Sequence, residues 1–263
     1  MKSEPEQNPE AEDGGDGESV NAVAERQFEA IRHALTERRR AINMTMSELG
    51  RIVGVSPSLI SQIERGQTLP SVGTLFALAA ALGVTVDAFL TEPEPRADAP
   101  APDPENVELG PLPGPDEVLG MPATAREAMY LVRRHARASV PIRGGVTWER
   151  LTPRSLEDVE FLELNYAPQA ESDDQLYRHP GIEMVLVLEG RFEIHVGFET
   201  YLLEEGDSIL FPSSLPHRYV NPTDETARAV TVILRDGIGS AIGPEGASSV
   251  EDAAPPAPPE QEE

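Results

Sequence analysis

Three ionisable side chains in the second half of the chain have a spacing that suits a metal ion. His179 and Glu183 are separated by three residues in YRHPGIEMVLVLEG, and His217 follows later in EEGDSILFPSSLPHRYVNP. Two imidazoles and one carboxylate can bind Fe, Mn, Ni or Zn, and with open coordination positions they form the facial triad of non-haem iron oxygenases. The sequence therefore predicts at most one divalent metal here. The alternative is that the same three side chains line an apolar ligand pocket.

A second group of polar side chains lies on a predicted helix, SPSLISQIERG at 56–66. Ser at the N-cap and Pro at the first helical position begin this helix, and Ile60 and Ile63 form its apolar face. Short hydroxyls and one amide project from the other face, as a helix in the DNA major groove requires. Arg65 would then lie over a phosphate strand. The exposed set comprises Pro57, Ser58, Ser61 and Gln62.

Four more helices are predicted around this one. Phe28, Ile31, Leu35 and Ile42 recur at near-helical spacing from residue 24, and Arg38–Arg40 could face either the helix C-terminus or a phosphate backbone. Thr45 and Glu48 form a capping box for the next helix, whose apolar face is Leu49, Ile52 and Val53, and Gly54 ends it. Ser71 is predicted to cap VGTLFALAAALG, and Thr85 to cap the short VDAFL.

The sequence after Met129 is rich in short β-type runs separated by Gly, Pro and Asp. Eight or so strands at this spacing predict a sandwich or barrel. Trp148 and Phe161 are expected in its core, and His195 at the surface; His33 and His135 have no ligand-like spacing. The runs are YLVRR, VTWERL, VEFLELNY, EMVLVLEG, RFEIHVG, ETYLL, DSILFP and ARAVTVILR.

Charge is distributed unevenly along the 263 residues, which carry a net charge of −25. Acidic or proline-rich composition predicts disordered tails at 1–23 and 237–263 and an extended linker at 92–125. In contrast, residues 26–91 hold seven arginines and five acids, a balance of +2. The absence of cysteine excludes disulfides and thiolate sites. No apolar run approaches the ~20 residues of a membrane span and no secretory signal is visible, so a cytoplasmic protein is expected.

The helical block, MSELGRIVGVSPSLISQIERGQTLPSVGTLFALAAALGVTVDAFL, resembles the XRE-type (phage-repressor-like) helix-turn-helix family. The resemblance implies a five-helix DNA-binding domain at 24–91. Some members carry glutamine where Met46 and Pro57 stand, and proline cannot donate a hydrogen bond to a base, so sparse direct readout is expected. The alternative is an ordinary helical bundle. The DNA contacts that the resemblance implies are Ser47, Ser56, Pro57, Ser58, Ser61, Gln62 and Arg65.

The second block, at 126–236, resembles the cupin family. Its first motif is His-x-His, three residues, Glu, six residues, Gly; Glu183 and Gly190 match it, His179 fills the second histidine place and Tyr177 the first. A phenol binds metal strongly only when ionised, so Tyr177 is predicted to line an effector pocket. The second motif is matched by Gly206, Pro212, His217 and Asn221. The resemblance implies a cupin β-barrel of the jelly-roll type.

Together these blocks predict a multidomain protein, α and then β, that regulates transcription. The helical domain would bind double-stranded DNA as part of a homodimer, and the cupin would bind a small-molecule effector. The rival is a mononuclear iron oxygenase resembling hydroxypropylphosphonate epoxidase, in which a lysine of the helical module reaches the substrate. The only lysine here is Lys2, which disfavours an enzyme. A sugar or phosphosugar isomerase would need more ligands than this chain offers.

Overall fold

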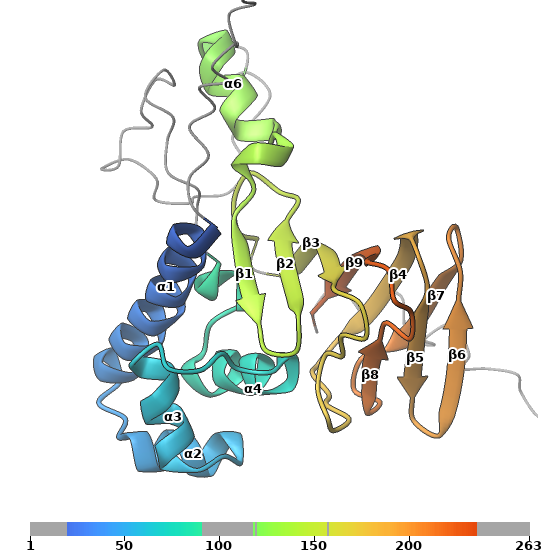
Figure 1. Cartoon of the computed structure of the whole chain (residues 1–263). Helices are drawn as coiled ribbons and strands as arrows, with labels where there is room; N and C mark the ends of the chain where they lie inside the picture. The colour runs from blue at the N-terminus through green and yellow to red at the C-terminus, as the bar shows by residue number, and fades with distance from the viewer. Residues whose placement is uncertain (1–19, 91–117, 119, 157, 236–263) are drawn as a thin grey trace, which may run out of the picture.

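The computed structural model describes residues 20–90, 118, 120–156 and 158–235 (Figure 1). In this part of the chain a helical N-terminal region precedes a β-sheet region. The predicted tail at 237–263 lies outside the described residues, as do most of the predicted tail at 1–23 and most of the predicted linker at 92–125. None of the described helices is long and apolar enough to cross a membrane.

Five helices form the N-terminal region, as the sequence predicts: α1 (Val20–Ala41), α2 (Met46–Val53), α3 (Pro57–Glu64), α4 (Val72–Leu82) and η1 (Val86–Phe89). The Thr45 hydroxyl accepts the Glu48 amide at 3.1 Å while the Glu48 carboxylate accepts the Thr45 amide at 2.8 Å. Ser71 caps α4 by accepting the Thr74 amide at 3.3 Å. The prediction for Thr85 is wrong, because its side chain makes no capping hydrogen bond and η1 is a single 3₁₀ turn.

The helical core contains most of the expected apolar side chains, including Ile31, Leu35, Leu49, Ile60 and Ile63. Two expectations are wrong: Ile42 is 48% exposed and Ile52 is 50% exposed. Ile42 follows the last residue of α1, so the helical period no longer directs it inward. The α2 helix has only eight residues and buries Leu49 and Gly50, which leaves Ile52 outside the narrow buried stripe.

Nine strands in two sheets form the C-terminal region. The larger sheet has the order β1-β2-β3-β9-β4-β7 and the smaller has β6-β5-β8, all antiparallel. Of the predicted alternatives, a sandwich or a barrel, the described strands form two sheets that are not closed into a barrel, which agrees with the sandwich. The bounds are β1 (Ser139–Ile142), β2 (Val146–Arg150), β3 (Val159–Tyr166), β4 (Ile182–Glu189), β5 (Phe192–Val196), β6 (Glu199–Leu203), β7 (Ser208–Pro212), β8 (His217–Val220) and β9 (Ala227–Leu234).

Some local expectations for this region also need correction. The first predicted strand, YLVRR, is instead the end of α6 (Ala123–Tyr130) followed by η2 (Arg134–Ala136). Trp148 is buried as predicted, whereas Phe161 is only half-buried. His195 is half-buried rather than at the surface, and its ring lies 2.7 Å from the Glu193 carboxylate.

The two regions pack directly against each other along α4 and η1. The Ser71 hydroxyl donates to the Asp173 carboxylate at 2.5 Å, and the Val72 amide donates to the Ser172 carbonyl at 3.0 Å. The Val86 amide of η1 donates to the buried Glu160 carboxylate at 3.2 Å. These contacts fix the angle between the regions, which the linker composition alone had left open.

Candidate DNA-binding face and metal centre

The predicted DNA contacts lie on one face built from α2 and α3, at the lower end of the molecule in Figure 1. Gly54, with φ of 82°, ends α2 in the left-handed region, where glycine is unstrained. Ser56 then caps α3 by accepting the Leu59 amide at 3.1 Å. Ser61 is half-buried, and the other six predicted residues are exposed: Ser47, Ser56, Pro57, Ser58, Gln62 and Arg65.

Some of these polar groups already have partners within the helical region. The Ser56 oxygen is engaged in the cap, and the Ser61 hydroxyl accepts the Arg65 guanidinium at 2.7 Å. Arg65 also donates to the Gln67 side chain at 3.1 Å, so two contacts orient it beyond the end of α3. Ser58 and Gln62 are exposed on α3 and take no part in these contacts.

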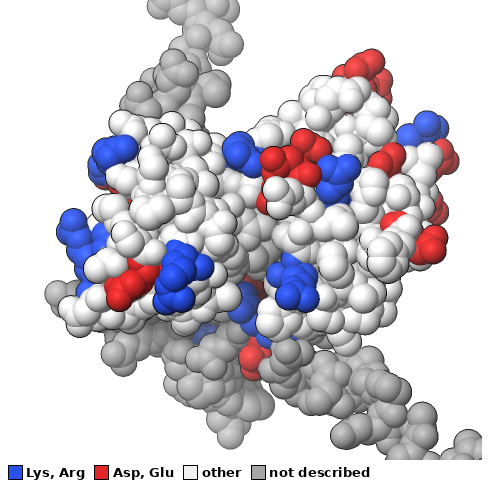
Figure 2. Space-filling view, turned by 90° about the horizontal axis from the view of Figure 1, so that it is seen from below, with Lys and Arg blue, Asp and Glu red and all other residues white. Residues whose placement is uncertain are grey.

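Viewed from below, this end of the molecule is mainly uncharged, with separate basic side chains (Figure 2). Acidic side chains are more numerous over the β-sheet region on the same face. A surface of this kind can approach phosphates in spite of the net charge of the whole chain.

A buried ion pair anchors the C-terminal end of α3. The Arg39 guanidinium donates to both carboxylate oxygens of Glu64, at 2.5 and 2.8 Å, and to the Met44 carbonyl at 2.8 Å. The hydrogen bond that Arg39 donates to Glu64 raises the pKa of Arg39. The suggestion that Arg39 reaches DNA phosphate is therefore wrong, because its charge is used to join the end of α1 to the end of α3.

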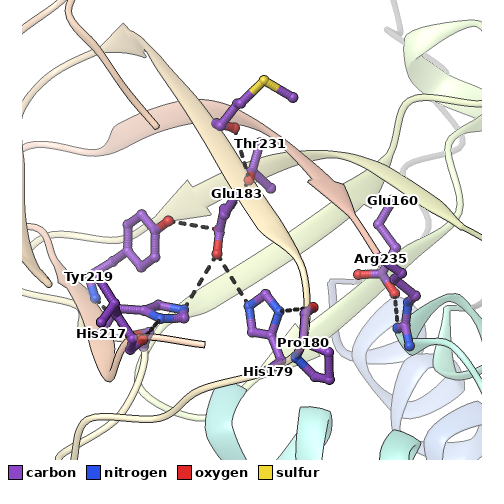
Figure 3. Close-up of polar contacts among 11 residues, drawn as sticks. Glu160, His179, Pro180, Glu183, His217, Tyr219, Thr231 and Arg235 are labelled. Carbon is purple, nitrogen blue, oxygen red and sulfur yellow. Dashed lines mark hydrogen bonds and ion pairs between the residues drawn. The ribbon is translucent and has the colours of Figure 1, made fainter. Parts of the chain in front are cut away.

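His179, Glu183 and His217 come together between the two sheets (Figure 3). His179 lies in the loop before β4, Glu183 is on β4, and His217 begins β8. The Glu183 Oε2 atom is 3.2 Å from His179 Nε2 and 3.4 Å from His217 Nε2. All three side chains are buried, and one ligand atom from each lies within 4.8 Å of the others.

The remaining polar atoms of this cluster have partners that fix its orientation. Glu183 Oε1 accepts the Tyr219 hydroxyl at 2.7 Å and the Thr231 hydroxyl at 3.1 Å. The Nδ1 atoms of His217 and His179 lie 2.8 and 3.4 Å from backbone carbonyls. Supports of this kind commonly orient the ligands of metal sites.

Three buried atoms are left without a hydrogen bond: His179 Nε2, Glu183 Oε2 and His217 Nε2. They lie at ion-pair distance from one another but make no hydrogen bond, and buried polar atoms need directional partners. Three convergent, unsatisfied donor atoms fit one divalent metal ion. A metal bound there would supply a Lewis-acidic centre with open positions.

The protonation states also suit a metal. Burial alone would raise the pKa of Glu183, but His179, His217 and the Tyr219 hydroxyl outweigh it and hold that pKa below its ordinary value. Burial lowers the pKa of His217, which favours the neutral imidazole. Metal binding requires a carboxylate and neutral imidazoles.

Tyr177 stands beside this cluster. Its ring meets the ring of His217 edge-on, with centroids 4.6 Å apart, and its backbone pairs with that of His217. Burial raises the pKa of the Tyr177 phenol well above its ordinary value, which disfavours the ionised form that binds metals. The neutral phenol is therefore poorly suited to act as a metal ligand.

Sequence reasoning missed three side chains of this site. Tyr219 follows His217 by two residues on β8, so the two-residue period of a strand could have found it. Thr231 carries no such signal, because β9 becomes the neighbour of β4 only through the sheet topology. Phe76, which stacks on His179, comes from α4 of the helical region and looks like any other core residue in the sequence.

The comparisons with known proteins agree with this architecture. Residues 35–89 match a family model described as helix-turn-helix, and residues 162–233 match one described as cupin domain. The chain is an XRE-type helix-turn-helix domain joined to a C-terminal cupin domain. Its homologues are HTH-type transcriptional regulators.

Two curated relatives and one solved structure illustrate the similarity of this helix-turn-helix–cupin chain. SutR of Escherichia coli is 23% identical over 199 residues, which cover 76% of this chain and 91% of SutR. PuuR of Escherichia coli is 23% identical over 197 residues, covering 75% and 90%. An HTH_3 family transcriptional regulator from Vibrio cholerae aligns with a TM-score of 0.51 at 20% identity, covering 80% of this chain and 98% of that one, and this likeness shows the fold.

Proposed function

We propose that this protein is a sequence-specific DNA-binding transcriptional regulator whose cupin domain binds a small-molecule effector. The proposed domains are residues 24–91 and 126–236, and the proposed location is the cytoplasm. The observation that carries the proposal is the capped, rigidly anchored α3, which exposes Ser58 and Gln62 beside Arg65. A helix presented in this way can enter the major groove without rearrangement.

The proposed DNA contacts are Ser47, Ser56, Pro57, Ser58, Ser61, Gln62 and Arg65. Arg65 contacts phosphate, whereas Gln62 and Ser58 contact bases. A homodimer would place two copies of α3 about one DNA turn apart, on a palindromic site. Because few polar groups on α3 are available for hydrogen bonds to bases, sequence-dependent DNA shape contributes to the choice of DNA site.

In the cupin, we propose that His179, Glu183 and His217 hold one divalent metal (Fe, Mn, Ni or Zn) and that Tyr177 lines the effector pocket. The effector binds over the open side of this cluster. The support is the set of three convergent atoms that have no hydrogen bond.

The test is binding of the full chain to DNA from upstream of its own gene, with a shuffled fragment as the matched control. We expect the upstream fragment to bind about 10³-fold or more tightly than the shuffled one at the same salt. Affinity should fall steeply with salt for both fragments. Equal affinity for the two would contradict sequence-specific binding.

A second candidate function is favoured by the geometry of the cluster, which also suits a mononuclear iron enzyme related in arrangement to hydroxypropylphosphonate epoxidase. Stoichiometric Fe(II) together with oxygen consumption on addition of a phosphonate substrate would favour the enzyme. Iron binding without oxygen consumption, combined with specific DNA binding, would favour the regulator.

A further inference from the structure

A side chain of the DNA-binding domain reaches the proposed metal site. Phe76, on α4, stacks on the ring of His179 with centroids 3.9 Å apart and planes inclined by 15°. The same ring lies 6.0 Å from the ring of Tyr177 and meets Trp148 edge-on at 5.6 Å. Phe76 is only 6% exposed, so these cupin rings surround it.

The other contacts along α4 and η1 keep Phe76 in this position. Gly73, one turn before Phe76, has no room for a side chain: a Cβ there would lie 2.7 Å from the Asp173 carboxylate and 2.8 Å from the Tyr177 Cβ. The α4 backbone at Gly73 therefore approaches these cupin side chains as closely as glycine allows. At the far end, Ser155 donates to Asp87 of η1 at 3.0 Å.

The α4 helix also belongs to the core of the DNA-binding domain. Leu75 and Leu78, on either side of Phe76, are fully buried, and α4 packs against α2 as well as against α1. A displacement of α4 relative to the cupin therefore moves the helices that carry the proposed DNA contacts. The α4 helix thus places Phe76 against a proposed metal ligand, while its leucines pack in the core of the DNA-binding domain.

Little space remains between α4 and His179. The cavity there, walled by Phe76, Ala77 and Ala80 on one side and by His179 and Ile233 on the other, has a volume of about 80 Å³. Pockets for metabolite-sized ligands have roughly 300 Å³ or more, so this cavity is too small for one. A bare metal ion can be held without moving α4, but an organic ligand that enters beside His179 must displace Phe76.

We infer that Phe76 forms one wall of the cupin site and that α4 transmits the occupancy of this site to the DNA-binding helices. A metal bound to His179 Nε2 fixes the imidazole plane on which Phe76 stacks and so holds α4 against the cupin. A larger ligand separates the two rings and releases α4. The consequence for DNA rests on the proposed function, but the coupling itself can be measured without DNA.

The experiment is hydrogen exchange of the full chain with and without Zn²⁺, reading the amides of α4 (Val72–Leu82). Zinc binds in the cupin, so it can slow amide exchange in α4 only if the opening of α4 is coupled to the opening of the cupin site. We expect zinc to slow exchange in α4 by about tenfold or more. Emission from Trp148, the chain's single tryptophan, should change in the same titration because its ring contacts Phe76.

Two variants and one matched control test the path from the cupin site to α4. Phe76→Leu keeps an apolar side chain but removes the ring stack, so zinc should still bind while its effect on α4 falls below about twofold. Phe89→Leu makes the same chemical change at a buried position of η1 and is the matched control, which should keep the full response. Gly73→Ala should also uncouple the domains, even though alanine favours the helix itself.

The outcomes separate the inference from the proposed function. A full zinc response in Phe76→Leu, zinc binding to the unaltered protein with no protection of α4, or no zinc binding at all would each overturn the inference. Protection of α4 that depends on Phe76, in a protein that does not bind DNA specifically, would instead support the inference and contradict the proposed function.

Discussion

On the α2–α3 face the polar side chains are exposed and held by short local contacts, whereas in the cupin the His179–Glu183–His217 cluster is buried and its ligand atoms lack partners. Exposed polar groups cost little to keep, since water solvates them until a partner arrives. Buried atoms without partners reduce stability until something binds them. The first arrangement suits a large external partner, and the second suits a small one that enters the fold.

The largest loss of folding stability is expected at the buried Arg39–Glu64 pair, in contrast to the exposed α2–α3 face. Arg39→Ala leaves Glu64 buried without a partner, so we expect the free energy of unfolding to fall by about 3–5 kcal/mol. Arg40→Ala, an exposed neighbour, is the matched control and should change stability by less than about 0.5 kcal/mol. Chemical denaturation of both variants measures the difference. Similar losses in the two would mean that the buried pair does not anchor α3.

The next prediction concerns the buried cluster. Glu183→Gln has nearly the same shape and still accepts Tyr219, but its amide removes the anionic ligand, so metal affinity should fall by about 100-fold or more. Glu193→Gln, on β5, is the matched control and should bind metal normally. Metal titration and elemental analysis measure the effect. Undiminished affinity in Glu183→Gln would rule out this cluster as the metal site.

The helices of the N-terminal region could be predicted from the sequence because the residues that begin and end them lie close together in the chain. The capping box at Thr45, the Ser56-Pro57 start of α3 and the Gly54 turn each depend on neighbours within four residues. The exposure of Ile52 was not readable, because an eight-residue helix repeats its apolar period only twice. Arg39 was misjudged for another reason: its partner Glu64 is distant in the sequence and meets it only in the folded domain.

In the cupin, the three ligand candidates were predictable from motif spacing, and the structure brings them together. Their supports were not, because Thr231 and Phe76 reach the site through sheet order and domain packing. Separate runs of β-type residues predicted most strands but not how they pair, so the sequence left a sandwich and a barrel open, and only the structure shows two unclosed sheets. Local spacing finds the ligand atoms; only the tertiary structure shows what holds them.

A smaller effect is expected on the exposed face. Gln62→Ala should weaken binding to the specific site by about 1–3 kcal/mol and leave binding to shuffled DNA unchanged. Gln62 is preferable to Ser61, whose removal would also release Arg65. Gln175→Ala, an exposed amide on the cupin, is the matched control. Equal losses for specific and shuffled DNA would contradict base contact by Gln62.

A buried carboxylate that is paired with arginines should make folding stability depend on pH. Burial alone would raise the pKa of Glu163, but Arg228 and Arg137, each at 2.7 Å, outweigh it and hold that pKa below the ordinary 4.5. A lowered pKa contributes stability that is present above the unfolded-state value and lost as pH falls through the folded-state value. Glu163→Gln should therefore be less stable at neutral pH, and its deficit should shrink below about pH 4.5. A deficit independent of pH would mean that the ion pairs do not contribute.

The smallest loss of DNA affinity is expected for Arg65→Ala. It measures how much of the binding by the α2–α3 face comes from contact with phosphate. Arg65→Ala should weaken binding equally for specific and shuffled DNA and reduce the slope of log affinity against log salt by about one. Folding stability should not change, because the guanidinium is exposed and its hydrogen bonds within the described residues go to neighbouring Ser61 and Gln67. Arg191→Ala, an exposed arginine paired with Glu204 on the cupin, should leave the slope intact. If the loss in Arg65→Ala depended on sequence, Arg65 would be reading bases, and the division between phosphate and base contacts on α3 would have to be redrawn.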